Sequence, residues 1–270
     1  MNAAGTTALS RRRILTVVRR HVIVLWRSPQ RWFDIAIWPL FDVILWGSLG
    51  AFVAQQDHTS RATTPYLLAG IMLFHVLFQS QIAVATGFME ETWSRNLLNL
   101  MTTPLTEGEY AAGLAVYAGM KTVLAMAAVS LTAFAFFGFG LGEVGWALVP
   151  VIGILLIVGW AVALFNIGLM LRFGQSAEIF TWGTNFLLLA VSGVFNPVSA
   201  LPAVAQPLAR VLPTTHAFGA ARTVLDGEAI PWSDIAWGYL GAAVMVALGY
   251  WFITWMLATF RDKGYVTRFS

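Results

Sequence analysis

The sequence predicts an all-α membrane protein that crosses the bilayer six times. Of its 270 residues, 58% are hydrophobic and 11% are charged, and the mean hydropathy is +0.72. A helix needs about 20 apolar residues to cross roughly 30 Å of hydrocarbon, and six stretches reach that length: 33–54, 66–88, 110–137, 146–171, 177–195 and 235–260. These runs are continuous rather than alternating, which favours helices over a β-barrel. They leave no room for a soluble domain, so we expect a single domain over residues 1–270.

Positive charges gather on one side of this predicted topology. Seven arginines precede the first span, and further cations lie in the second-to-third loop, in the fourth-to-fifth loop and after the last span. The opposite side holds only Arg61, Arg210 and Arg222. Because Lys and Arg stay on the cytoplasmic side, we expect both termini in the cytoplasm and the protein in a bacterial inner membrane. The same bias accounts for the pI near 9.5 without a nucleic-acid partner.

Residues 12–27, ahead of the first span, have the pattern of an amphipathic helix. At 3.6 residues per turn the apolar side chains share one arc, and the opposite arc holds the arginines Arg12, Arg13, Arg19, Arg20 and Arg27. Trp26 lies at the apolar edge, which suits the membrane–water boundary. We expect an interfacial helix that leads into the first span; the alternative is a basic tail that only sets the topology.

The loop after the second span is longer than two neighbouring helices need. Its residues 90–101 predict a short amphipathic helix that ends at Thr103–Pro104. Exposed apolar side chains rimmed by charge are typical of a docking surface; the alternative is a second span that extends into water. The candidate docking residues are Glu90, Glu91, Trp93, Arg95, Leu97, Leu98, Leu100 and Met101.

Two ionisable residues interrupt the apolar spans at similar depth. Asp42 lies about nine residues into the first span and Lys121 about eleven into the third, which places both roughly 14–16 Å from the cytoplasmic side. We expect them to approach each other, either as a buried pair that fixes helix packing or as an ion-coupling site. Other polar and aromatic residues within the spans either bond neighbouring helices or line a translocation path: Trp38, Trp46, His75, Gln79, Asn166 and Asn185.

Between the fifth and sixth spans, residues 197–222 are rich in proline and yet apolar. Each proline lacks a backbone N–H and fixes φ, so one straight helix is excluded. Broken backbone of this kind is tolerated beside a membrane mainly where protein buries it or where it lines a cavity. We expect one of these two situations here.

The sequence contains no recognisable motif for bond-making chemistry. The nearest approach to a phosphate-binding loop, from Gly113 to Thr122, has the wrong spacing and lies inside an apolar span. The four histidines are scattered without the spacing of metal ligands, so no metal is expected. We therefore expect a protein that is not an enzyme and holds no cofactor of its own.

Two stretches, together with the topology, resemble the ABC-2 type transporter permeases. One is Thr102–Thr103–Pro104–Leu105–Thr106, at the end of the connector. The other runs from Pro197 to Arg222 and contains Leu201–Pro202, Gln206–Pro207 and Pro213–Thr214–Thr215–His216. The resemblance covers the whole chain and is closest to the branch that exports drugs and lipo-oligosaccharides. One departure is the neutral segment 218–221, where such proteins often carry an acidic residue.

The resemblance implies that the chain is half of a dimeric conduit, formed with a second copy or a paralogous permease. It would export a drug, a lipid or a lipid-linked glycan. Separate ATPase subunits would bind ATP and Mg and would dock on 90–101 as a coupling helix, with 12–27 touching the same subunit. The first and fifth spans would face the partner and the conduit. Short re-entrant helices would close the outer end, with gate residues Phe195, Pro197, Pro202, Pro207, Pro213 and His216.

Two other classes of function are open from the sequence. An ATP-independent carrier would couple ions through Asp42 and Lys121, and its transport would survive loss of any ATPase; against it, the sequence shows no internal repeat of the kind common in carriers. A membrane-embedded lipid transferase would need histidines and carboxylates that converge at one depth, a feature that the sequence lacks.

Overall fold

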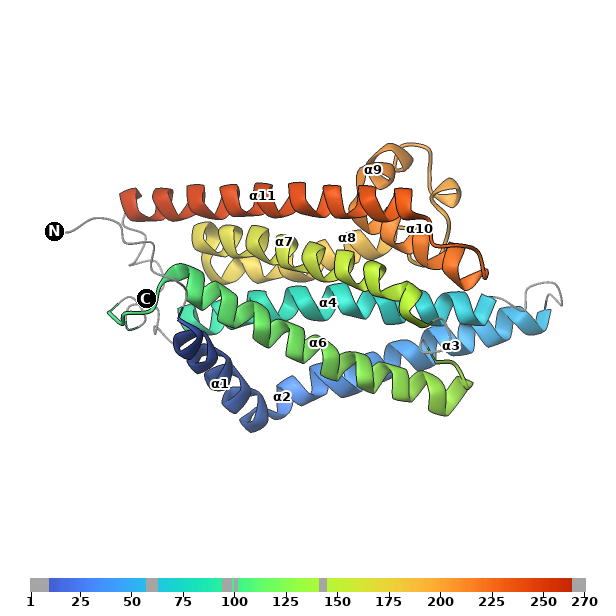
Figure 1. The fold of residues 1–270 in the computed structure, drawn as a ribbon, viewed down its shortest axis with the longest axis horizontal. Coiled ribbons are helices and arrows are strands. Elements are labelled where there is room, and N and C mark those ends of the chain that lie inside the picture. The colour runs from blue at the N-terminus through green and yellow to red at the C-terminus, as the bar shows by residue number, and fades with distance from the viewer. Residues whose placement is uncertain (1–9, 57–62, 94–98, 100–101, 141–144, 264–270) are drawn as a thin grey trace.

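The computed structural model describes residues 10–56, 63–93, 99, 102–140 and 145–263 (Figure 1). These residues form helices and connections, without a strand in any of the described ranges. Five helical segments there are long and apolar enough to cross a membrane: Pro29–Gln56, Thr64–Glu91, Gly108–Phe137, Gly145–Phe173 and Trp232–Thr259. The predicted all-α fold with several spans is confirmed.

The helix α4 (Thr63–Trp93) is the centre of the bundle. It packs against α3 (Trp38–Gln56), α6 (Glu107–Phe137) and α7 (Val149–Phe173). In its most apolar stretch 94% of the residues are buried, against 17% for α11 (Trp232–Lys263), which packs on α7. A helix that is apolar all round is either enclosed by protein or faces lipid. In this bundle α4 is the enclosed helix, and α11 leaves most of its apolar surface outside.

Close packing at the centre depends on a glycine of α7. A β-carbon on Gly159 would lie 2.8 Å from the backbone oxygen of Leu77 in α4. Backbone yields less readily than a side chain, so any larger residue at this position would push α4 and α7 apart.

The first span begins with an irregular turn. After α1 (Arg11–Arg27) the chain passes through α2 (Pro29–Trp32) and a π-helical turn, η1 (Phe33–Ile37), into α3. Pro39 of α3 has no N–H, and in an α-helix its ring would collide with the carbonyl four residues back. The wider turn, in which the Trp38 N–H bonds to the carbonyl five residues back, makes room for that ring. Figure 1 shows α1 running obliquely to α3 as a result of the bend before α2.

The fifth predicted span is shorter than expected. The sequence predicts 177–195, but the α-helix α8 covers only the 14 residues Glu178–Val191, after a 3-10 turn, η4 (Gly174–Ala177). At 1.5 Å per residue its length is about 21 Å, less than the roughly 30 Å of a full span. The helix ends because Gly193, with φ +70°, turns the chain into a conformation that other residues rarely adopt.

Short helices follow α8, as the resemblance implies, and the prolines exclude one straight helix there. The short helices are η5 (Val198–Ala200), α9 (Gln206–Val211) and α10 (Pro213–Leu225). Pro207 and Pro213 lie in the first turns of α9 and α10, where the missing N–H has no helical partner to lose. These helices lie at one end of the bundle, which we call the cap end. The other end, with the C-terminus of α4 and the N-terminus of α6, is the connector end (Figure 1). A 3-10 turn, η3 (Gly145–Leu148), leads into α7.

Candidate functional site

The connector end holds the residues predicted to dock a partner. Glu90 and Glu91 lie in the last turn of α4. The remaining predicted docking groups lie outside the described residues, so the coupling helix stays a prediction: the side chain of Trp93, and Arg95, Leu97, Leu98, Leu100 and Met101.

The start of α6 is fixed by a capping box. The Thr106 hydroxyl accepts a bond from the Glu109 N–H at 3.3 Å, and the Glu109 carboxylate accepts one from the Thr106 N–H at 3.1 Å. The same carboxylate accepts a bond from the Ser10 N–H at 2.8 Å, just before α1 begins. These bonds satisfy backbone donors that a helix start leaves open. They also hold a carboxylate where α1 and α6 meet.

Two arginines of α1 bind buried carboxylates at the connector end. Arg13 contacts Glu109 at 2.9 Å, and Arg20 holds Glu91 through two contacts of 2.5 and 2.9 Å. Both glutamate side chains are only 1% exposed. A two-pronged arginine–carboxylate contact fixes orientation as well as distance. Arg13 ties α1 to the first turn of α6, and Arg20 ties α1 to the last turn of α4.

A third pair involves the start of the first span. Arg31 of α2 pairs with Glu90 of α4 and donates a hydrogen bond to the Tyr117 hydroxyl of α6 at 3.1 Å. The arginine side chain is 13% exposed. One arginine therefore joins α2 to both α4 and α6.

The buried face of α1 differs in part from the predicted one. The sequence pattern places the arginines of residues 12–27 on one polar arc facing away from the apolar side chains. In the structure Arg12 and Arg19 are exposed as expected, whereas Arg13 and Arg20 turn toward carboxylates. Their separation of seven residues, about two helical turns, is the signal in the sequence that marks one face. The helix itself is confirmed, and its position at a membrane surface stays a prediction.

His21 lies on the same buried face of α1. It is 2% exposed and stacks on Tyr117 with ring centroids 5.1 Å apart. Burial lowers the pKa of His21 to about 4, and this effect outweighs the opposing influence of the nearby Glu91. The imidazole is therefore neutral near pH 7 and packs as an aromatic ring rather than as a cation.

The structure gives Asp42 and Lys121 different partners from those predicted. Asp42 of α3 lies 3.2 Å from Nε2 of His75 in α4, within ion-pair distance, although the angle is not that of a hydrogen bond. Lys121 of α6 is 3% exposed, and its largest charge interaction is with Asp34. In place of the expected approach to Lys121, Asp42 lies against His75, and Lys121 interacts electrostatically with Asp34.

The first span and α6 start at different heights in the bundle, and this difference explains why the predicted pair does not form. The bond from Arg31 to Tyr117 puts the start of the first span beside a residue about three turns into α6. Equal depths counted from the two span starts are therefore not equal heights in the bundle. The sequence contains no measure of this offset, because it depends on how α2 packs against α6.

Gln79, predicted to line a path, completes the π-helical turn. Trp38 donates to Phe33, and Pro39 has no N–H, so the carbonyl of Asp34 lacks a helical donor. Nε2 of Gln79 in α4 donates to that carbonyl at 2.8 Å. This fully buried amide joins η1 to α4 and meets the requirement that backbone groups inside a membrane be satisfied.

The predicted path residues Asn166 and Asn185 also join helices. Asn185 of α8 donates to Oε1 of Gln81 in α4, whose own amide donates to the Thr181 carbonyl at 3.1 Å. Asn166 of α7 accepts a bond from the Thr184 hydroxyl of α8 at 3.4 Å. Both asparagines are almost completely buried. Within one chain they connect α4, α7 and α8, which is the commoner use of polar groups in spans.

Aromatic side chains of α3 meet the region of α8. Trp38 lies edge-on to Trp182 of α8 at 6.5 Å, and Trp46 stacks on Phe195 with centroids 3.8 Å apart. The first span thus contacts both α8 and the segment that follows it.

The remaining contacts at the cap end are mostly neutral. The hydroxyls of Ser192 and Thr214, both buried, lie 2.7 Å apart. Arg222 donates to the carbonyl of Asn196 at 3.0 Å and closes the loop between α8 and η5. Burial lowers the pKa of Arg222.

His216 lies beside Asp234 at the start of α11. Its Nδ1 is 3.2 Å from the carboxylate, and both side chains are partly exposed. Between His216 and Arg222, the side chains of Phe218, Ala220 and Ala221 are buried in the core. An acidic residue there would be enclosed by apolar groups, which gives the neutral segment 218–221 a structural reason.

The profile of the ABC-2 type transporter family matches residues 12–225, which is most of the chain. The chain belongs to this family. A search of curated proteins finds no significant match. The matched range extends from the start of α1 to the last residue of α10 and so includes both ends of the bundle described above.

An ABC-2 permease is the membrane component of a transporter and generally works with an ABC ATPase instead of carrying an ATPase site. This ABC-2 permease is accordingly a multi-pass membrane protein and a transmembrane subunit. Its arginine–carboxylate pairs flank the loop where a partner subunit is predicted to dock.

Proposed function

We propose that this permease forms half of a dimeric conduit that exports an amphiphilic or hydrophobic substrate: a drug, a lipid or a lipid-linked glycan. A second copy or a paralogous permease supplies the other half, and separate ATPase subunits supply ATP hydrolysis with Mg. Family membership supports the transport role and an ATPase partner in general. The observation that carries the proposal is the set of arginine–carboxylate pairs at the connector end.

The connector end is the proposed cytoplasmic side. α1 and α2 bring seven arginines to that end and contain no acidic residue, in line with the retention of positive charge in the cytoplasm. Both termini are then cytoplasmic, in a bacterial inner membrane. α1 lies along the membrane surface, where its exposed Leu15 and Trp26 contact lipid.

The ion pairs make the N-terminal helix move with the connector. An ATPase that pushes on residues 90–101 displaces the ends of α4 and α6 together with α1, because Arg13 and Arg20 hold α1 to both. α1 continues through α2 into α3, so the displacement reaches the first span. Transporters use rigid-body shifts of this kind to change which side is open.

The cap end is the proposed outer gate. The stack of Trp46 on Phe195 joins α3 to the chain after α8, so a displaced α3 separates the two rings. Pro197, Pro202, Pro207, Pro213 and His216 belong to the segment that closes this end. Exposed apolar side chains on α3 and α8, such as Phe41 and Phe186, suit a partner or lipid on the same side.

The first test is affinity purification of the tagged chain from its native membranes in mild detergent, followed by mass spectrometry. We expect a stoichiometric ATPase subunit that is lost when Leu97, Leu98 and Leu100 are changed to Asp. The matched control changes three exposed apolar residues of the cap end to Asp: Val204, Leu208 and Val211. We expect this control variant to retain the ATPase subunit. A chain that purifies alone from cells expressing such ATPases contradicts the proposal.

An ion-coupled carrier has weaker support, because the two residues that it needs have separate partners. Substrate efflux from cells lacking the ATPase separates the two functions. Efflux that persists there and depends on Asp42 favours the carrier.

A further inference from the structure

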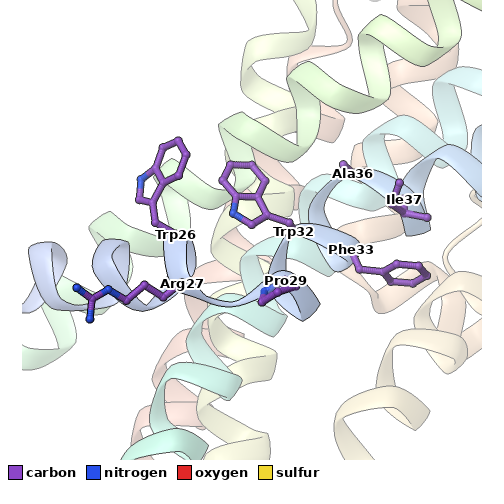
Figure 2. Close-up of a pocket in the computed structure, with 7 residues that line it drawn as sticks. All are labelled: Trp26, Arg27, Pro29, Trp32, Phe33, Ala36 and Ile37. Carbon is purple, nitrogen blue, oxygen red and sulfur yellow. The ribbon is translucent and has the colours of Figure 1, made fainter.

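A groove lies at the elbow between α1 and the first span. Its volume is about 510 Å³, and its walls include Trp26, Arg27, Trp32, Phe33 and Ile37. Figure 2 shows the indoles of Trp26 and Trp32 projecting to the same side of the chain, with Phe33 farther along η1. The indole rings are 5.1 Å apart and tilted by 60°.

The segment that forms the groove, together with α1 before it, is mostly positive, and its one acidic residue is Asp34. Residues 10–33 contain seven arginines and no Asp or Glu. Three of these arginines hold the carboxylates described above. The other four form no ion pair with the residues that the structure describes: Arg11, Arg12, Arg19 and Arg27. An anion is therefore the ligand that this surface attracts.

The apolar part of the groove is open to the outside of the bundle. Trp26 is 69% exposed, and Phe33 and Ile37 are each at least 40% exposed. Arg27 is the last residue of α1, and Phe33 and Ile37 follow in the first turns of the span. A cation therefore stands at one end of the groove, and a strip of apolar side chains runs from it along the span. Tryptophan pairs of this kind are typical of the boundary between headgroups and hydrocarbon.

We propose that this groove binds an anionic phospholipid from the leaflet in which α1 lies. The phosphate would pair with Arg27, and an acyl chain would lie along Phe33 and Ile37. A second copy of the chain is the other conceivable occupant, but two such surfaces would bring like charges together. The proposal rests on the proposed position of α1 at the membrane surface. It does not rest on transport, because its test needs neither ATP nor an ATPase.

The test uses the full chain in detergent with phosphatidylglycerol that carries a photoreactive group on its acyl chain. Phosphatidylcholine with the same acyl chain is the neutral reference. We expect phosphatidylglycerol to label peptides within residues 26–37 about fivefold more than phosphatidylcholine, in line with one arginine near a membrane surface. Arg27→Gln reduces this label to the reference level. Arg11→Gln, at the far end of α1, leaves it unchanged.

Three results would contradict the proposal that this groove binds an anionic phospholipid. Equal labelling by the two lipids would remove the role of charge. An equal loss in the Arg27→Gln and Arg11→Gln variants would mean diffuse attraction along α1. Crosslinks between two chains at residues 26–37, without lipid label, would assign the groove to a second copy. If Arg27→Gln does not fold, competition by unlabelled phosphatidylglycerol against phosphatidylcholine on the unchanged chain decides the same question.

Discussion

The two ends of the bundle are held together by different chemistry. At the connector end, α1 and α2 are joined to α4 and α6 by three arginine–carboxylate pairs, and two of the carboxylates are 1% exposed. At the cap end the apolar side chains of α10 pack in the core. The polar and aromatic contacts described there are a ring stack, a pair of hydroxyls, a bond from an arginine to a backbone carbonyl and one partly exposed histidine–aspartate contact.

This difference bears on what each end can do. A charge pair over a buried carboxylate is costly to break by losing one member, so the connector end behaves as a rigid joint. Ring stacks and neutral hydrogen bonds contribute about 0.5–1.5 kcal/mol each, so the contact between Trp46 and Phe195 can separate at less cost. Under the proposed function, the rigid end receives the push of the ATPase and the weaker end opens.

The largest expected effect comes from removing one arginine of the connector end. Arg20→Gln takes the cation from a carboxylate that is 1% exposed, and we expect a loss of about 3 kcal/mol in unfolding free energy. Thermal unfolding of the purified chain in detergent measures it. Arg19→Gln is the control, since Arg19 is exposed, and it should change stability by less than about 0.5 kcal/mol. Equal losses of stability in the two variants would contradict the view that ion pairs to buried carboxylates hold the connector end together.

A second effect at the connector end depends on pH. Burial holds the pKa of His21 at about 4, whereas an unfolded chain has a value of about 6.5. Between these values the unfolded state binds more protons, so stability falls as the pH falls, by about 2 kcal/mol from pH 7 to pH 5.

His21→Phe keeps a ring against Tyr117 and removes the titrating group. Unfolding of both proteins across this pH range measures how steeply the unfolding free energy of each one changes with pH. The variant should lose less stability on acidification than the unchanged chain. Identical slopes of stability against pH would show that His21 does not cause the loss of stability on acidification.

A smaller effect is expected from one hydrogen bond at the cap end. Thr214→Val leaves the buried Ser192 hydroxyl without its partner at 2.7 Å, and we expect a loss of about 1–2 kcal/mol. Ser192→Ala combined with Thr214→Val should cost less than the sum of the single changes, because no polar group is then left unsatisfied. Additive losses in the double-mutant cycle would mean that the two hydroxyls do not interact.

The smallest expected effect is that of salt. At about 1 M salt the screening length falls to roughly 3 Å, and the half-exposed arginines of α1 lose part of their attraction. Hydrogen exchange in α1 should then rise by about threefold, a change of less than 1 kcal/mol. Exchange in α10 should stay the same. A rise at both ends would indicate general loosening instead of screened pairs.

Much of the fold follows from short-range patterns in the sequence. The apolar runs predict the long helices, and the prolines predict an interruption where the structure has the short helices α9 and α10. The amphipathic pattern of residues 12–27 predicts α1. Span 177–195 is the exception, because the run of apolar residues continues past Gly193, where the backbone turns. Composition does not distinguish an apolar helix from apolar chain after a turn.

The partners of the polar residues could not be predicted in the same way. Asp42 and Lys121 match in counted depth, yet the first span starts beside Tyr117, well inside α6, and Asp42 lies against His75 instead. The sequence presents Gln79 only as a polar residue that could line a translocation path. Its bond to the Asp34 carbonyl depends on a π-helical turn imposed by Pro39.

The sequence alone determined the class of the protein, the position of its helices and its membership in the ABC-2 family, because hydropathy, proline positions and motif spacing are local properties of the chain. Only the tertiary structure decided which charges meet. Arg13, Arg20 and Arg31 could each have faced solvent, and their contacts with Glu109, Glu91 and Glu90 arise from how α1 and α2 lie across α4 and α6. Such contacts join residues far apart in the chain, and helical periodicity specifies a face but not what lies opposite it.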